Sequence, residues 1–286
     1  MLTYDFSEKA VRQLRDFWIQ GSSQGNIEVG GYLDVVETRV QGAFLDFKAI
    51  DDDDVALQQP RRPNPHDHCQ FSSYEACMFH THPSTAFHDQ PPPSGKDFLF
   101  FTVWGGPNNE ANRGGHLHSD LDVVVVRGGF YTIQKHEQVC DAIRSLSKSE
   151  RPRYYQLIEW YASVASTLLL IGHISFDTFA MTMERLDFPA MIVRFNRAEN
   201  AVFREQFFAD AADQQMFDFD SDTLRALSSQ LPPPTTNLGR LLAGPEPIDG
   251  FVVRFQPFPK ELIPAYDPPA PIGWEEVGVV GLTTGK

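Results

Sequence analysis

Two short patterns, a His-Thr-His-Pro run and further along a Pro-Ser-Gly-Lys-Asp run, constrain this chain more than any other feature. In a β-strand, side chains two residues apart point to the same face, so His80 and His82 can converge on one point. Ser94, followed three residues later by Asp97 and then by an apolar run, is typical of the first turn of a helix. The patterns therefore predict a strand that ends at His82 and a helix that begins at Ser94.

These side chains have the chemistry of a catalytic zinc site. Two imidazole nitrogens and one carboxylate oxygen form a three-ligand set that leaves the fourth tetrahedral position open for water. We expect His80, His82 and Asp97 to hold Zn2+, and the open position favours hydrolysis over a structural role. Each fragment alone also has an ordinary explanation, because other His-x-His pairs occur and Ser94 with Asp97 can be a plain helix capping box.

An acidic residue begins a predicted strand upstream of the two patterns. Ile27, Val29 and Leu33 alternate along one face of this strand, while Glu28 points to the other face. Taken alone, such an acid is a typical solvent-facing residue. Here, however, Glu28, the His-x-His-Pro run and the Ser-x-x-Asp run follow one another in this order along the chain.

This order resembles the motif of the JAMM (MPN+) zinc metalloproteases, and the resemblance covers about residues 1–145. Each residue of that motif has a counterpart in this chain: Glu28, His80, His82, Pro83, Ser94 and Asp97. The resemblance implies an α/β fold of the MPN-like, cytidine-deaminase-like kind, in which helices flank a mixed sheet. It also implies that the two histidines and Asp97 are the zinc ligands. Glu28 would then be the general base, and Ser94 would donate a hydrogen bond to the oxyanion.

Enzymes of this family commonly cut the isopeptide bonds of ubiquitin and ubiquitin-like proteins. The resemblance therefore implies an isopeptidase whose partner is a ubiquitin or ubiquitin-like conjugate. One departure is the interval between His82 and Ser94, whose eleven residues exceed the family's usual spacing. The loop over the metal is therefore enlarged, and it brings His88 and Asp89 within reach as alternative ligands. We expect the segment 84–93 to overhang the metal and to restrict access to thin, extended substrates.

Three other interpretations stay open. The chain can be a catalytically inactive MPN scaffold in a multi-protein complex, although that class typically lacks metal ligands. It can also be a zinc hydrolase of ordinary peptides, of modifier precursors or of a small-molecule amide. Finally, two further groups could hold a structural zinc, although neither shows a complete four-ligand pattern: His66, His68 and Cys69, and His116, His118 and Asp120.

The charge balance argues against nucleic acid as a partner. Lys plus Arg number 24 and Asp plus Glu number 38, which gives a net charge of -14, and no basic run offsets this excess. The N-terminal residues lack the basic and apolar regions of a signal peptide, and three cysteines do not make a disulfide framework. We therefore expect an intracellular protein, in the cytoplasm or also in the nucleus.

The hydrophobic pattern divides the chain into two parts. We assign residues 1–150 to the metalloprotease-like domain and residues 151–286 to an α+β extension with a Pro-rich tail. The pattern of the first part predicts a regular series of elements: a helix from Ser7 to Gly21, strands at 26–37 and 41–50, the strand ending at His82, a helix at 94–104, strands at 121–126 and 130–133, and a helix through Val139 and Leu146.

The second part resembles no family that we recognise. Its pattern predicts helices at 154–172, 176–186 and 199–228 and strands at 191–195 and 251–255. The apolar stretch 158–174 is too short for a membrane span, so it predicts a buried helix and no membrane contact. The second part is either an appended domain that binds a protein partner or an extension that packs on the catalytic part without a binding role.

Overall fold

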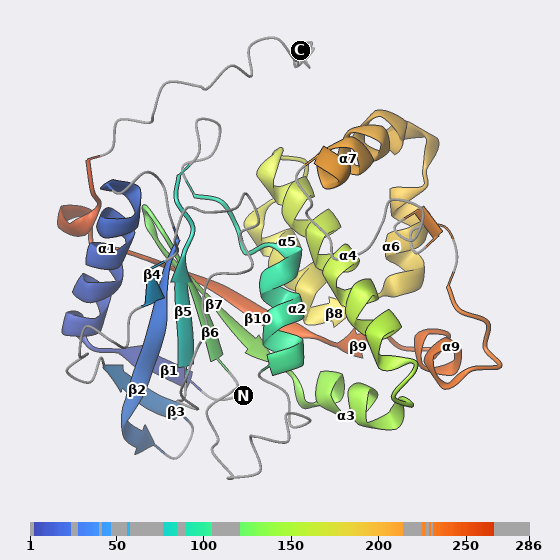
Figure 1. Ribbon diagram of the computed structural model, residues 1–286, viewed down its shortest axis with the longest axis horizontal. Coiled ribbons are helices and arrows are strands. Elements are labelled where there is room, and N and C mark those ends of the chain that lie inside the picture. Colours follow the sequence, from blue (N-terminus) through green and yellow to red (C-terminus); the bar gives the residue numbers. More distant parts are fainter. Residues whose placement is uncertain are drawn as a thin grey trace.

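The computed structural model describes residues 3–23, 28–39, 42–46, 56–57, 77–84, 90–104, 121–213, 225–226, 229 and 231–265. These residues form an α/β structure in which helices lie on both faces of a mixed sheet (Figure 1). The strands of this sheet are β1 (Thr3–Phe6), β2 (Val29–Arg39), β3 (Gly42–Asp46), β4 (Ala56–Leu57), β5 (Cys77–Thr81), β6 (Leu121–Val126), β7 (Gly129–Lys135) and β10 (Phe251–Pro257).

Within the described residues, the sheet has eight strands in the order β1-β3-β2-β5-β6-β7-β10, with β4 paired to β2. Strands β1 and β3 are parallel, as are β5 and β6, whereas the other neighbours are antiparallel. The predicted hairpin at 121–133 is confirmed, because β6 and β7 pair through a tight turn from Val126 to Gly129. A separate pair of short strands, β8 (Arg185–Leu186) and β9 (Ile248–Asp249), lies outside this sheet.

Helix α1 (Glu8–Ser23) covers one face of the sheet. Its start follows from the sequence, because the Ser7 hydroxyl accepts a hydrogen bond of 2.9 Å from the Ala10 N–H and so satisfies a free donor of the first turn. The helix continues two residues past Gly21, where the sequence predicts its end. Its apolar stripe packs on the sheet residues that point the same way, and the cluster comprises Ala10, Leu14, Trp18, Phe79, Leu121, Val123, Val125, Phe130, Phe258 and Leu262.

The opposite face carries α2 (Gly95–Trp104), α3 (Glu137–Ser145), α4 (Arg151–Leu170) and α5 (Phe176–Glu184) (Figure 1). Helix α4 is the buried helix that the sequence predicts: most of its residues from Leu157 to Leu168 are buried. In the part of the chain that the structure describes, no helix has both the length and the apolar character that crossing a membrane requires.

The second half of the chain completes the sheet that the first half begins. Strand β10, predicted at 251–255, pairs with β7 so that Phe251 lies opposite Lys135 and Pro257 opposite Gly129. After β10 the chain passes to the other face, where Phe258 and Leu262 join the cluster under α1. One hydrophobic cluster on the α4 side also unites residues from before and after position 150. The second half therefore supports both faces of the sheet.

The predicted strand at 191–195 is wrong, because these residues belong to helix α6 (Phe188–Phe195). The Asp187 side chain accepts a hydrogen bond of 2.9 Å from the Ala190 N–H, and a proline stands in the first turn, so the local sequence starts a helix. Met191 and Phe195 are buried whereas Val193 is 61% exposed, which is the spacing of a helix and not of a strand. The β-branched residues between them suggest a strand only when this spacing is ignored.

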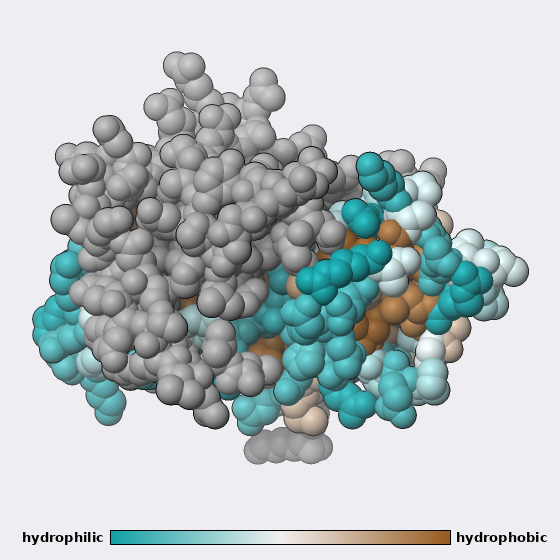
Figure 2. All heavy atoms as spheres, turned by 90° about the horizontal axis from the view of Figure 1, so that it is seen from below, coloured by the Kyte–Doolittle hydropathy of each residue, from teal (hydrophilic) through white to brown (hydrophobic). Residues whose placement is uncertain are grey.

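The other helices with described bounds belong to the second half. They are η3 (Ala198–Asn200), α7 (Ala201–Asp213), α9 (Asn237–Leu242) and η4 (Lys260–Leu262), and the sequence does not predict α9. Helix α7 accounts for the first part of the predicted helix 199–228, and residues 214–224 lie outside the described part. Seen from below, Figure 2 shows hydrophilic residues over much of the coloured surface and apolar side chains gathered toward the right, where the C-terminal helices lie.

Candidate metal centre

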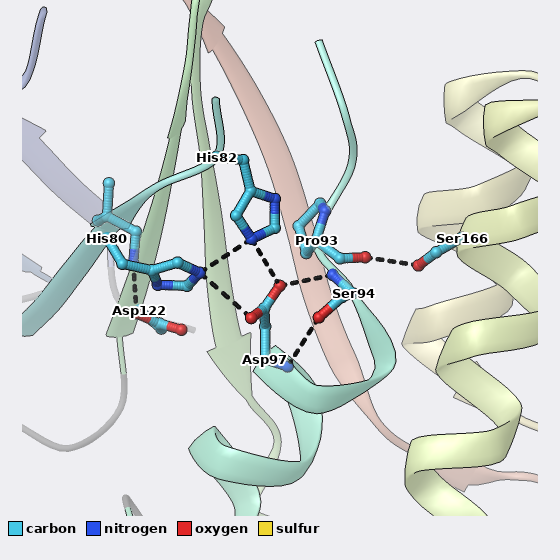
Figure 3. Close-up of polar contacts among 8 residues, drawn as sticks. His80, His82, Pro93, Ser94, Asp97, Asp122 and Ser166 are labelled. Carbon is cyan, nitrogen blue, oxygen red and sulfur yellow. Dashed lines mark hydrogen bonds and ion pairs between the residues drawn. The ribbon is translucent and has the colours of Figure 1, made fainter. Parts of the chain in front are cut away.

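The structure brings the two histidines and Asp97 together. His80 lies in β5 opposite Val124 of β6, and both belong to the α4 side of the sheet, whereas the neighbouring Phe79 belongs to the α1 side. His82 follows the end of β5, and Asp97 lies in the first turn of α2. Their side chains point toward one another in the space between the strand and the helix (Figure 3). The predicted meeting of a strand end and a helix start is confirmed.

The spacing of the three side chains fits a metal ion. The two Nε2 atoms of His80 and His82 are 3.1 Å apart. Asp97 Oδ1 lies 3.2 Å from the His80 Nε2 atom, and Asp97 Oδ2 lies 3.3 Å from the His82 Nε2 atom. With metal–ligand bonds of about 2.0–2.1 Å, tetrahedral ligands of zinc are about 3.3 Å from one another. Among the described residues, these three could therefore hold a metal ion.

Asp97 also caps the helix that carries it. Its backbone N–H donates to the Ser94 hydroxyl at 3.3 Å, and the Ser94 N–H donates in return to Asp97 Oδ2. This is the reciprocal capping box that the sequence suggests as an ordinary explanation. Both interpretations hold at once, because the capping bond fixes the carboxylate in the orientation that faces the histidines.

The charges within the group stabilise one another. Burial acts to lower the pKa of His80, but the Asp97 carboxylate, together with Asp122 and Glu28, outweighs burial and raises this pKa to about 10. Asp97 and Glu28 likewise raise the pKa of His82 against the effect of burial. Burial acts to raise the pKa of Asp97, but the two histidines hold that pKa well below its usual range. The Asp97 carboxylate therefore favours positive charge at the two imidazoles. A cation bound here would supply that positive charge.

Glu28 stands beside the same group. Glu28 directly precedes β2, which runs antiparallel to β5 with Gly30 opposite His80. Two residues before Gly30 therefore correspond to two residues after His80, which brings Glu28 toward His82. Burial raises the pKa of the Glu28 carboxyl, and the nearby His82 and His80 oppose that shift. The structure thus places an acid with a raised pKa next to the two histidines but outside the group of three ligand atoms.

Two further residues hold this arrangement in place, and the sequence does not reveal their roles. The Thr81 hydroxyl, between the two histidines, accepts a hydrogen bond of 2.8 Å from the Val29 N–H, next to Glu28. The Trp18 indole donates a hydrogen bond of 3.0 Å to the His82 carbonyl oxygen from the other face of the sheet. The alternating pattern indicates only that Thr81 points away from the histidines, and the helical pattern only that Trp18 is buried.

Asp122 is a buried acid of β6, and the sequence predicts it only as part of a strand at 121–126. It lies near His80 on the same side of the sheet (Figure 3), and its Oδ1 atom accepts a hydrogen bond of 2.9 Å from the Val123 N–H. Burial raises its pKa to about 6, although the positive charge of His80 opposes that shift. The Asp122 carboxylate acts on His80 electrostatically and contributes to the raised pKa of its imidazole.

Several predicted residues lie outside the described part of the chain. They are His88 and Asp89 of the enlarged loop, and His66, His68, Cys69, His116, His118 and Asp120 of the two further groups. The loop is described again from Gln90, whose carbonyl oxygen accepts a hydrogen bond of 3.4 Å from the Tyr131 hydroxyl. The end of the loop is thus attached to β7 before it enters α2.

Compared with known proteins, the chain matches no protein-family model, no curated protein and no solved structure. The likeness to the JAMM motif is therefore a resemblance of six residues and their order. The geometry of the site stands independently of that resemblance, because it comes from the distances between the side chains themselves.

Proposed function

We propose that this chain is a zinc-dependent isopeptidase or peptidase of the JAMM (MPN+) type, with an MPN-like catalytic part. It would remove or process ubiquitin or a ubiquitin-like modifier, and conjugates of such a modifier would be its substrates. The observation that supports this proposal is the approach of His80, His82 and Asp97 to within 3.3 Å, with Glu28 beside them. Two imidazoles and one carboxylate match the ligand sets of catalytic zinc sites.

The side chains around the metal suit the hydrolysis of an amide bond. The chemistry that zinc supplies when bound is Lewis acidity, which lowers the pKa of a water molecule to about 7. Glu28 would take a proton from the attacking water and later pass it to the leaving amine, because it lies beside the two histidines without belonging to the group of ligand atoms. His80, His82 and Asp97 would hold the metal.

Ser94 would assist the reaction. Its hydroxyl oxygen accepts the Asp97 N–H, so its own proton can be donated to an oxygen outside the capping box. Donation to the oxyanion of the tetrahedral intermediate contributes about 3 kcal/mol where such donors have been removed. Ser94 would thus combine helix capping with stabilisation of the transition state.

The test measures metal content and cleavage on the same sample. The purified protein is expected to hold one zinc, and it should cleave at least one member of a panel of ubiquitin-like conjugates, chains and precursors unless a chelator is present. His80→Ala should lose both zinc and cleavage, whereas His173→Ala, a change at an exposed histidine, should lose neither. A protein that holds no zinc would favour the inactive scaffold. A zinc-bound protein that cleaves only other amides would show that its substrate is not a ubiquitin-like conjugate.

A further inference from the structure

We propose that helix α4, from the half of the chain without a recognised family, is a structural part of the metal centre. Through Ser166 and through its close contact with Gly95, it fixes the turn that presents Asp97 to the histidines. This inference rests on the metal site of the proposed function, and it does not depend on which bond the protein cleaves. It assigns a role to the second half that the sequence leaves open.

The first contact is a hydrogen bond across the two halves. The buried Ser166 hydroxyl donates to the Pro93 carbonyl oxygen at 2.5 Å, directly before the capping residue Ser94 (Figure 3). Pro91, Pro92 and Pro93 have no backbone N–H, so carbonyl oxygens are the only backbone groups through which these residues can form hydrogen bonds. Ser166 therefore holds the segment directly before α2 through one of these carbonyl oxygens, that of Pro93.

The second contact is the close approach of α2 to α4 at Gly95. A Cβ atom added to Gly95 would lie 2.4 Å from the Glu159 carbonyl oxygen and 1.9 Å from the Ser163 hydroxyl. The serine side chain can rotate away, but the backbone carbonyl of a buried helix cannot. Any larger residue at this position must therefore push α2 away from α4. Since Asp97 lies in the first turn of α2, such a shift would move its carboxylate relative to the histidines.

The third contact is made by the residue that follows Asp97. Phe98, the residue after Asp97, is fully buried and packs edge to face with Phe251 of β10, at 5.1 Å between ring centroids, and with Phe179 of α5, at 6.5 Å. Both aromatic partners come from the second half of the chain. The first turn of α2 is thus held by hydrogen bonding, by close backbone contact and by aromatic packing, and each of these partners lies beyond residue 150.

The effect on metal binding follows from the geometry that a metal demands. Replacing residues that orient metal ligands without contacting the metal themselves typically changes metal affinity by about 10–100-fold. Ser166 acts through the backbone of the turn, so we expect Ser166→Ala to weaken zinc binding by about tenfold. Gly95→Ala displaces the whole turn, and we expect a loss of about 100-fold.

The test measures the zinc affinity of the full-length protein by competition with a chromogenic chelator. Thr167→Ala is the matched control, because Thr167 is the next residue of α4 and its hydroxyl donates a hydrogen bond of 2.8 Å to the Ser163 carbonyl oxygen within the same helix. Ser166→Ala and Thr167→Ala each remove one hydrogen bond of α4, but only Ser166→Ala should weaken zinc binding. The visible absorption of the Co2+-loaded protein should change in the same variant, because it reports the geometry of the ligands.

The possible results distinguish a failure of the role of α4 from a failure of the proposed function. If Ser166→Ala and Thr167→Ala lower the melting temperature of the metal-free protein alike and both keep the parent zinc affinity, α4 is only a packing element and the inference is wrong. If Gly95→Ala does not fold, the Ser166 and Thr167 pair decides. A parent protein that binds no zinc would overturn both the inference and the proposed function. A parent that binds zinc but cleaves no conjugate would remove only the proposed function.

Discussion

At the scale of single residues, the Asp97 side chain of the candidate site has two structural roles. Asp97 closes the first turn of α2 through Ser94 and faces His80 and His82 with its two oxygens. The positive end of the helix dipole also favours a carboxylate at this position. A sequence pattern that could be dismissed as a capping box is for this reason compatible with a metal ligand.

Glu28→Gln separates catalysis from metal binding. Gln can still accept a hydrogen bond, but it cannot take a proton at neutral pH, so the cleavage rate should fall by about 10² to 10⁴. Burial disfavours the charged form of Glu28, so the neutral replacement should keep or raise the melting temperature, and zinc content should be unchanged. Rate, metal content and melting temperature are measured on one preparation. Normal cleavage by this variant would refute the role of Glu28.

Thr81→Val tests how the strand of Glu28 is joined to the strand of the histidines. The change keeps the shape but removes the acceptor of the Val29 N–H, and Val29 is fully buried, so the free energy of unfolding should fall by about 1–3 kcal/mol. We expect slower cleavage because the position of Glu28 is then less well defined. Thr81→Ser keeps the hydroxyl and should recover most of both losses. Urea denaturation and rate measurements check this pair, and equal behaviour of the two variants would contradict it.

At the scale of elements, short-range sequence signals predict where a helix begins better than they predict whether a short apolar segment is a helix or a strand. Ser7, Ser94 and Asp187 each accept a hydrogen bond from the first turn of a helix, as their residue types suggest. The segments 193–195 and 253–255 share the letters Val-Arg-Phe, yet the first is in helix α6 and the second in strand β10. The capping residue before α6 and the pairing partner of β10 decide between the two states.

Glu150 offers a pH test of how α9 is attached. Its carboxylate accepts hydrogen bonds from the Ser147 hydroxyl and from the Leu238 N–H at the start of α9, and these bonds lower its pKa to about 2. Because the folded pKa lies below the ordinary value of 4.5, the stabilisation is present above pH 4.5 and is lost as the pH falls toward 2. Glu150→Gln should therefore lower the melting temperature at pH 7 and make a smaller difference at pH 3.5. A difference that does not change with pH would argue against this attachment.

At the scale of the whole molecule, the two halves form one hydrophobic structure. β10 provides an edge of the sheet next to β7, and the cluster on the α4 side contains residues of both halves. Residues 1–150 expressed alone should therefore expose the apolar side chains of α2 and β7, aggregate, and fail to bind zinc with the parent affinity. Size-exclusion chromatography and zinc titration measure this outcome. A soluble fragment with a cooperative unfolding transition and full zinc affinity would show that the first half is independent.

The sequence by itself determined the features that depend on short-range order. The spacing of His80 and His82, the capping pair Ser94 and Asp97, and the tight turn between β6 and β7 all act within a few residues, so a linear pattern contains them. Only the tertiary structure decided what supports the site. Trp18 reaches His82 across 64 positions and Ser166 reaches Pro93 across 73, and no local pattern specifies such partners. Their contacts exist because burying the two faces of one sheet brings α1 and α4 against the segments that carry the ligands.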